Sequence, residues 1–266
     1  TKKNKMKIFD CFMYNNEELI LNLRLNYLNQ NVEKFIIVES EFDHQGNKKK
    51  LNFDINKFNK YKNKIEYLVI SDFPKNLGNW ERENFQRNYL SNGLHIAADD
   101  DYILISDVDE IPNLLQINDI ENHKYTAFKQ KNLFYKFNLL NKTIPDWHGS
   151  KICKKKYLKS PQWLRKQKVK KFSLLKFYKI KWNIIENGGW HFSYLMTPRM
   201  IKEKLESFAH SEYNLEFYTN EGRIEEMIAK KKDLFNRKQV YERIDIDQTY
   251  PKYILDNREK FKYWII

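Results

Sequence analysis

Residues 102–112 read YILISDVDEIP, in which a short apolar run is followed at once by three acids within four residues. A continuous apolar run of this kind is typical of a strand that is buried on both faces of a sheet. The same pattern predicts further strands at 7–12, 34–39 and 65–70, with helices between them at 19–28 and 80–98. This alternation predicts an α/β fold with a mostly parallel central sheet flanked by helices.

The rest of the chain, residues 113–266, alternates less regularly and predicts an irregular α+β half. Residues 126–140 are expected to form strand, and helices are expected from Thr197 onward and over 221–233. No linker composition separates the two halves, so we predict a single domain over residues 1–266.

The charge balance is strongly positive, with 48 Lys and Arg against 35 Asp and Glu and a formal net charge of +13. Such a surplus arises either from a general bias toward lysine or from an anionic partner, such as nucleic acid, membrane or a phosphorylated substrate. The seven glycines include no glycine-rich loop that would cradle a phosphate. Cys11 and Cys153 are too few for a disulfide framework or a zinc site.

The sequence predicts no transmembrane segment, because it contains no run of about 18 apolar residues. Its first residues are polar and basic, which does not fit a signal peptide. We therefore expect a cytoplasmic protein, or one at the cytosolic face of a membrane. The basic stretch 154–181 and the apolar residues 263–266 are candidate contacts with anionic lipid.

Asp107, Asp109 and Glu110 follow a predicted buried strand directly. Ligands of parallel sheets bind beyond the carboxyl ends of the strands. Neighbouring carboxylates repel each other unless a cation lies among them, and magnesium or manganese accepts such oxygens while leaving positions open for phosphate. The alternating spacing points Asp107 and Asp109 the same way and turns Glu110 aside. A second interpretation of these acids is a solvated turn that caps the next helix.

Five ordered segments carry a resemblance to a known family. They are Phe9–Phe12 with Asn16, Glu17, Leu21 and Arg24; Val38–Ser40 with Gly46, Lys49 and Phe53; Trp80 with Arg87; Asp107–Pro112; and Gly189–Ser193. Together they extend from residue 8 to about residue 195, and on them the chain resembles glycosyltransferase family 17, which includes the bisecting N-acetylglucosaminyltransferases. The part after about residue 200 does not contribute to the resemblance.

The resemblance implies a GT-A type nucleotide-sugar fold, with residues 1–112 as the nucleotide-binding half and 113–266 as the acceptor-side half with C-terminal helices. It also implies an inverting transfer from UDP-N-acetylglucosamine that depends on a divalent metal, with manganese favoured over magnesium. Carried over by position, it implies metal ligands at Asp107, Asp109 and His191, and donor-binding residues at Glu39, Trp80, Arg87 and Asp107.

Each of these assignments has a structural alternative. His191 and Trp80 also fit packing in the core, and Glu39 also fits a helix cap or an ion pair. Arg87 either binds the diphosphate or holds the acidic loop through Asp107.

The acceptor hydroxyl also needs a general base, which we expect to be a carboxylate with a raised pKa. Asp146, before Trp147, and Glu186, before the Gly188–Gly189 turn, are the candidates. The acceptor is expected to be a saccharide, free or linked to a lipid carrier.

Two other classes of function fit parts of the sequence. Clustered acids with a basic surface also serve metal-dependent phosphoryl-transfer enzymes and nucleases. Aromatic residues among the lysines of 154–182 fit a non-catalytic RNA-binding module. No recognised aromatic motif of an RNA-binding sheet is present, so nucleic acid is the less favoured partner.

Overall fold

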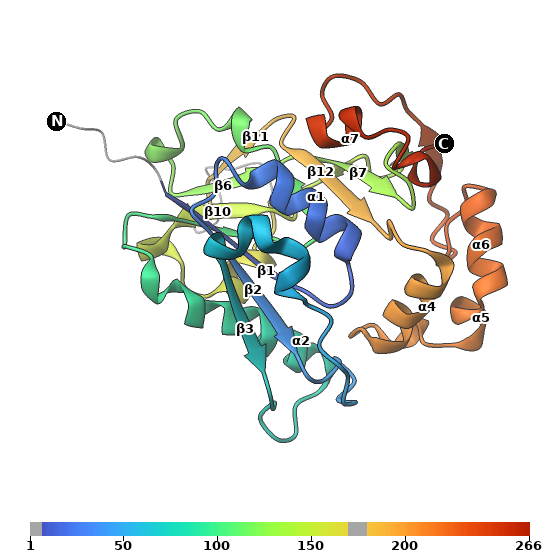
Figure 1. Cartoon of the computed structure of the whole chain (residues 1–266), viewed down its shortest axis with the longest axis horizontal. Coiled ribbons are helices and arrows are strands. Elements are labelled where there is room, and N and C mark those ends of the chain that lie inside the picture. Colours follow the sequence, from blue (N-terminus) through green and yellow to red (C-terminus); the bar gives the residue numbers. More distant parts are fainter. Residues whose placement is uncertain (1–6, 170–179) are drawn as a thin grey trace, which may run out of the picture.

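The computed structural model describes residues 7–169 and 180–266 and shows a mixed α/β protein with two sheets (Figure 1). The strands are β1 (Ile8–Met13), β2 (Lys34–Ser40), β3 (Ile65–Ile70), β4 (Tyr102–Ile105), β5 (Glu110–Pro112), β6 (Tyr125–Phe128), β7 (Gln130–Phe134), β8 (Leu139–Asn141), β9 (Asp146–Trp147), β10 (Lys151–Lys154), β11 (Trp182–Ile185), β12 (Gly189–Ser193) and β13 (Tyr241–Arg243). The α-helices are α1 (Glu18–Leu28), α2 (Asn79–Tyr89), α3 (Pro161–Lys166), α4 (Pro198–Ser207), α5 (Glu216–Thr219), α6 (Glu221–Ala229) and α7 (Lys252–Asp256).

The predicted alternation of strands and helices in the first part of the chain is confirmed by β1, α1, β2, β3, α2 and β4. The second predicted helix, over 80–98, is not a single α-helix. The α-helix α2 ends at Tyr89, and the chain continues as a 3₁₀ helix over Leu90–Ile96. The predicted strand region 126–140 contains β6, β7 and β8, which belong to two different sheets.

The larger sheet has the strand order β11-β6-β10-β4-β1-β2-β3. Within it β4, β1, β2 and β3 are parallel, which confirms the α/β class, and β10 runs antiparallel between β4 and β6. The order β3-β2-β1-β4 reverses direction between β1 and β4, and ligands of open α/β sheets bind beyond the strand ends at such a reversal. The acidic stretch follows β4 at this point.

The smaller sheet has the order β13-β8-β7-β12-β5, with β9 paired to β7. β12 is antiparallel to β5, which places His191 opposite Glu110. Gly189 begins β12 with φ at +121°, and a Cβ there would lie 2.1 Å from the carbonyl oxygen of Ile111. Glycine is therefore required where the two chain segments meet.

Helices cover both faces of the larger sheet. α1 packs against one face together with Ile8, Phe35 and Leu104, and α7 packs beside α1, whereas α2 and the 3₁₀ helix after it pack against the face that carries Phe9 and Ile36. α4, α5 and α6 gather at one end of the molecule around a separate apolar cluster (Figure 1).

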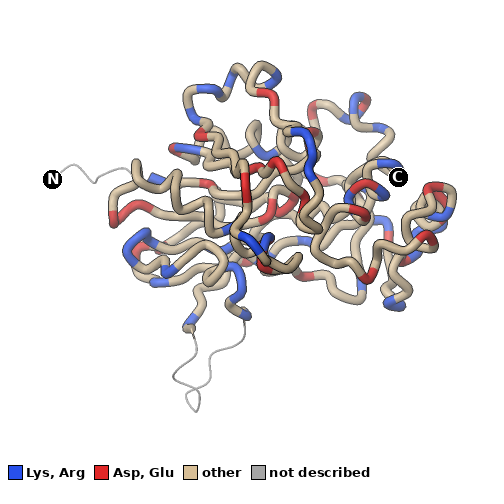
Figure 2. Tube along the Cα trace, turned by 90° about the horizontal axis from the view of Figure 1, so that it is seen from below, with Lys and Arg blue, Asp and Glu red and all other residues tan. Residues whose placement is uncertain are grey.

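The predicted lipid contacts are the basic stretch 154–181 and the apolar residues 263–266. Figure 2 shows Lys and Arg spread over many described segments and interspersed with acids. Of the basic stretch 154–181, residues 170–179 lie outside the described part of the chain. At the other end, Trp264 and Ile265 pack against the main core, while Tyr263 is exposed. Among the helices within 7–169 and 180–266, none has the length and apolar character needed to cross a bilayer.

Candidate active site

A cavity of about 690 Å³ opens where β1 and β4 end. Its walls come from the segment after β1, from α2 and α3, from the acidic loop after β4, from β12 and from α4. Five of the predicted site residues line it, namely Trp80, Arg87, Asp107, Asp109 and His191. The position of the cavity agrees with the reversal of strand order in the larger sheet.

A fully buried arginine, Arg24 on α1, fixes the shape of the acidic loop. Its Nε and Nη2 atoms form a bidentate pair with Asp10 on β1 at 2.8 and 2.6 Å. Its Nη1 donates to the carbonyl oxygens of Asp107 and Glu110 at 3.1 and 2.7 Å. One guanidinium group therefore fixes the conformation of the loop by binding its backbone carbonyl oxygens, and Asp10 neutralises the charge of that group.

The carboxylate of Asp107 is paired with two arginines from different helices. Arg87 on α2 donates to its Oδ1 at 3.1 Å, and Arg165 on α3 donates to its Oδ2 at 2.7 Å. Burial alone would raise the pKa of Asp107, but these two guanidinium groups hold it well below its usual range. Of the two predicted roles of Arg87, the geometry shows the contact with Asp107.

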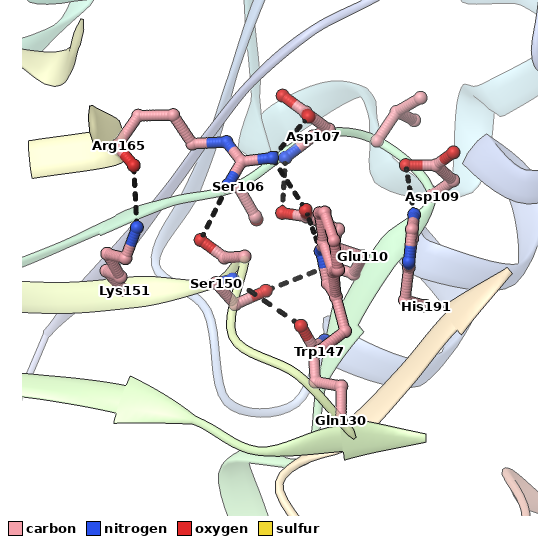
Figure 3. A network of polar contacts seen from close by, with 12 residues as sticks. Ser106, Asp107, Asp109, Glu110, Gln130, Trp147, Ser150, Lys151, Arg165 and His191 are labelled. Carbon is pink, nitrogen blue, oxygen red and sulfur yellow. Dashed lines mark hydrogen bonds and ion pairs between the residues drawn. The ribbon is translucent and has the colours of Figure 1, made fainter. Parts of the chain in front are cut away.

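Glu110 is fully buried and joins the loop to the smaller sheet (Figure 3). Its carboxylate accepts hydrogen bonds from the Asp107 backbone N–H at 2.9 Å, from Trp147 Nε1 at 2.5 Å and from Arg165 at 2.8 Å. A Cβ on Gly149 would lie 1.8 Å from its Oε1, so a side chain at position 149 would displace this carboxylate. Glu110 is thus turned aside from the cavity, as the alternating spacing predicts.

Asp109 and His191 face each other in the cavity at 3.9 Å between Oδ1 and Nε2 (Figure 3). The Asn132 amide donates to a carbonyl through its nitrogen, so its oxygen accepts from His191 Nδ1 at 3.0 Å. Trp147 stacks on the imidazole at 4.7 Å between ring centroids. In the neutral imidazole, the lone pair of Nε2 is therefore directed toward Asp109.

Burial raises the pKa of Asp109, against the opposing effect of His191 and Lys204. A buried carboxylate that faces an imidazole nitrogen is stabilised either by a proton on the imidazole or by a cation between the two groups.

These residues allow a test of whether the predicted metal fits. Asp109, in the turn before β5, and His191, on β12, present an oxygen and a nitrogen ligand to the same cavity. Hard divalent ions are commonly held by one or two protein side chains together with substrate phosphates, so this pair fits such an ion. Asp107 is less open to a metal than Asp109, because each of its carboxylate oxygens already accepts a hydrogen bond from an arginine. Among residues 7–169 and 180–266 there is no group of three or more His, Cys, Asp or Glu arranged to hold a metal without a substrate.

Glu39 is fully buried, and its carboxylate is used inside the protein. It accepts hydrogen bonds from Lys49 Nζ, from the backbone N–H groups of Asn52 and Phe53, and from the Tyr67 hydroxyl, all between 2.7 and 3.0 Å. These contacts fix the chain that follows β2 and correspond to the predicted ion-pair alternative.

The two predicted base candidates lie away from the cavity. Asp146 and Glu186 both pair with Lys129, at 3.2 and 3.1 Å, and both side chains are about half exposed or more. Neither lines the cavity, so the geometry gives no support to a base role for them. Trp80, in contrast, is 48% exposed at the cavity wall, where its ring meets His210 edge to face.

Sequence reasoning did not single out several basic residues in and beside the site, among them Arg165, Lys151 and Lys204. Arg165 lies within the basic stretch, Lys151 donates to the Arg165 carbonyl oxygen at 2.6 Å, and Lys204 lines the cavity from α4. Burial, together with the nearby charge of Arg165, lowers the pKa of Lys151 to about 8. In a sequence with 48 Lys and Arg, no local pattern distinguishes these residues from surface residues.

Fold and site together define an α/β protein with a charged cavity at the strand reversal, the place where this class binds its ligands. The model of glycosyltransferase family 17 matches residues 1–265, and the chain belongs to this family.

Similar curated proteins are the beta-1,4-mannosyl-glycoprotein 4-beta-N-acetylglucosaminyltransferases of Rattus norvegicus and Homo sapiens, each 22% identical, and of Mus musculus, 21% identical. Each match covers 97% of this chain and 54% of the relative. The chain thus spans about half the length of the curated relatives it matches.

Proposed function

We propose that this protein is an inverting glycosyltransferase with a GT-A type fold that transfers N-acetylglucosamine from UDP-N-acetylglucosamine to a saccharide hydroxyl. The observation that carries the proposal is the acidic strand end at the sheet's reversal point, in a chain that belongs to glycosyltransferase family 17. The names of the similar proteins favour N-acetylglucosamine as the sugar.

In this proposal the donor diphosphate lies against Asp109 and His191. A divalent ion held by these two residues, with manganese favoured over magnesium, would neutralise the charge that develops on the departing diphosphate. Asp107 positions Arg87 and Arg165 beside the same cavity. Trp80 offers an exposed aromatic face at the wall, on which a base or a sugar ring can stack.

A thermal-shift panel of nucleotide sugars with manganese tests the donor. A ligand that binds the native state raises stability by RT ln(1 + [L]/Kd), about 2.7 kcal/mol at a concentration of 100 Kd. We expect UDP-N-acetylglucosamine to raise the melting temperature more than GDP- or ADP-sugars do. No shift with any nucleotide sugar, together with metal-dependent cleavage of an oligonucleotide, would favour the nuclease alternative instead.

The acceptor and its setting are part of the proposal. We propose a saccharide acceptor, free or on a lipid carrier, which the basic stretch would help to reach at an anionic membrane. Flotation with anionic liposomes tests this, and binding is expected at low salt and not at high salt. Absence of binding at low salt would remove membrane contact from the proposal and leave glycosyl transfer untouched.

A further inference from the structure

Lys204 on α4 is a largely buried cation that the proposed function leaves without a role. Its side chain is 25% exposed and lines the cavity of about 690 Å³. It also lines an adjoining hollow of about 230 Å³ between α4 and the segment after β1. The Lys204 side chain therefore borders both hollows.

Acidic residues around Lys204 favour the charged form of its ammonium group. Burial opposes the charged form, but Glu17 and Asp109 hold the pKa of Lys204 above its usual range. Its ion pair with Glu17 is long, at 3.5 Å between Nζ and Oε1. The other oxygen of Glu17 accepts the backbone N–H groups of Asn15 and Asn16 at 3.1 and 3.0 Å, so the carboxylate is shared.

The ammonium group has three N–H donors. Within the described part of the chain, the long contact with Glu17 is the one hydrogen bond that its Nζ makes. Lys204 is therefore charged, mostly buried and short of acceptors.

The other cations at the cavity differ from Lys204 in this respect. Arg87 pairs with Glu83 at 3.0 Å as well as with Asp107, and Arg165 pairs with Asp107 and Glu110. Lys49 pairs with Glu39 at 2.9 Å. Lys166 is exposed. Of the buried and half-buried cations at the wall, Lys204 thus has the greatest capacity to donate to an incoming anion.

We propose that Lys204 binds the diphosphate of a nucleoside diphosphate ligand and donates to its oxygens beside Asp109. This inference rests on the proposed function, because it takes the ligand to be the UDP part of the donor. A bond between an ammonium and a phosphate oxygen in a part-buried site strengthens as negative charge accumulates on the departing diphosphate. The residue would supply positive charge in addition to any metal.

Calorimetric titration of UDP and of uridine into Lys204→Gln tests the proposal, with manganese and again with a chelator. Hydrogen bonds to charged groups are worth roughly 1.5–3 kcal/mol, so UDP affinity is expected to fall about ten- to hundredfold while uridine affinity stays unchanged. Lys202→Gln is the matched control, since Lys202 lies on the same helix, pairs with Glu221 at 3.7 Å and does not line the cavity. It should bind UDP like the unaltered protein.

Lys204→Arg keeps the charge and is expected to retain more UDP affinity than Lys204→Gln. Unchanged UDP affinity in Lys204→Gln overturns the proposal, as does an equal loss for UDP and uridine, which would indicate a general change of the site. If the unaltered protein binds UDP under neither condition, the UDP-sugar function itself fails, and this inference fails with it.

Discussion

Two aspartates separated by one residue have different surroundings, and this difference determines what their substitution does. Asp109 faces His191 and has no arginine partner among the described residues. We expect Asp109→Asn to fold normally and to lose the manganese-dependent part of its UDP affinity, because the substitution removes an anionic ligand. Calorimetry with and without manganese measures this loss, and an unchanged dependence on manganese would contradict the assignment.

Asp107→Asn provides the comparison. It removes a counter-charge shared by Arg87 and Arg165, so we expect it to lower the free energy of unfolding by about 1–3 kcal/mol. Urea denaturation measures this change. The pair of variants thus separates a loss of ligand binding at one aspartate from a loss of stability at the other.

The lowered pKa of Lys151 predicts that the free energy of unfolding depends on pH. Its pKa is lowered to about 8 in the folded protein, whereas a lysine in the unfolded chain titrates near 10.5. Between these pH values the unfolded state binds more protons, so the contribution of this residue to stability rises with pH, by at most about 3 kcal/mol. Below pH 8 the full cost of the buried ammonium is present.

The measurement is the free energy of unfolding at intervals from pH 7 to 10.5. Lys151→Met should remove this component of the rise, because methionine does not titrate. Parallel curves for the two proteins would show that Lys151 titrates normally.

At the scale of elements, α1 is joined to the loop between β4 and β5 by Arg24. Arg24→Met would leave Asp10 buried without its partner and would free the loop carbonyls. Breaking a buried pair from one side costs about 3–5 kcal/mol, and we expect a loss of this size in urea denaturation. Asp10→Asn/Arg24→Met should recover part of it, since no charge is then left unpaired. A loss below 1 kcal/mol in the single variant would mean that the loop is held by other contacts.

The sequence predicted those elements that have a local signature. β1 to β4 follow from apolar runs, and the start of α4 follows from Thr197, whose hydroxyl accepts from the Met200 backbone N–H at 3.3 Å. The pairing of β10 with β4 was not predictable, because Lys151 and Ile105 are far apart in the chain and neither carries a pattern that marks the other.

The same distinction applies to the candidate site. Asp107 and Asp109 were found because acids directly after a buried strand form a local pattern, and both line the cavity. The ion pairs that occupy Asp107 were not foreseen, since they depend on α2 and α3 meeting beside the loop. The internal contacts of Glu39 were not foreseen for a similar reason. The groups that donate its four hydrogen bonds belong to chain segments that follow it, and no local pattern in the sequence links them to Glu39.

At the scale of the whole molecule, the two predicted halves share one sheet and one core. The larger sheet continues from β4 into β10, β6 and β11, all of which follow residue 112. The main apolar cluster runs from Ile8 to Phe261 and includes Leu104 and Ile152. A fragment that ends at residue 112 would expose the edge of β4 and much of this cluster.

We therefore predict that residues 1–112 do not fold alone and that the full chain unfolds in a single transition. Ending the fragment there also removes Arg165 and Trp147, so Asp107 and the buried Glu110 would lose partners that satisfy their charges. Circular dichroism and urea denaturation of the fragment and the full chain measure both expectations. If the sheet needs β10 beside β4, the fragment has no folded state and shows no cooperative transition. A cooperative transition in the fragment would therefore contradict this prediction and show that the nucleotide-binding half is an independent domain.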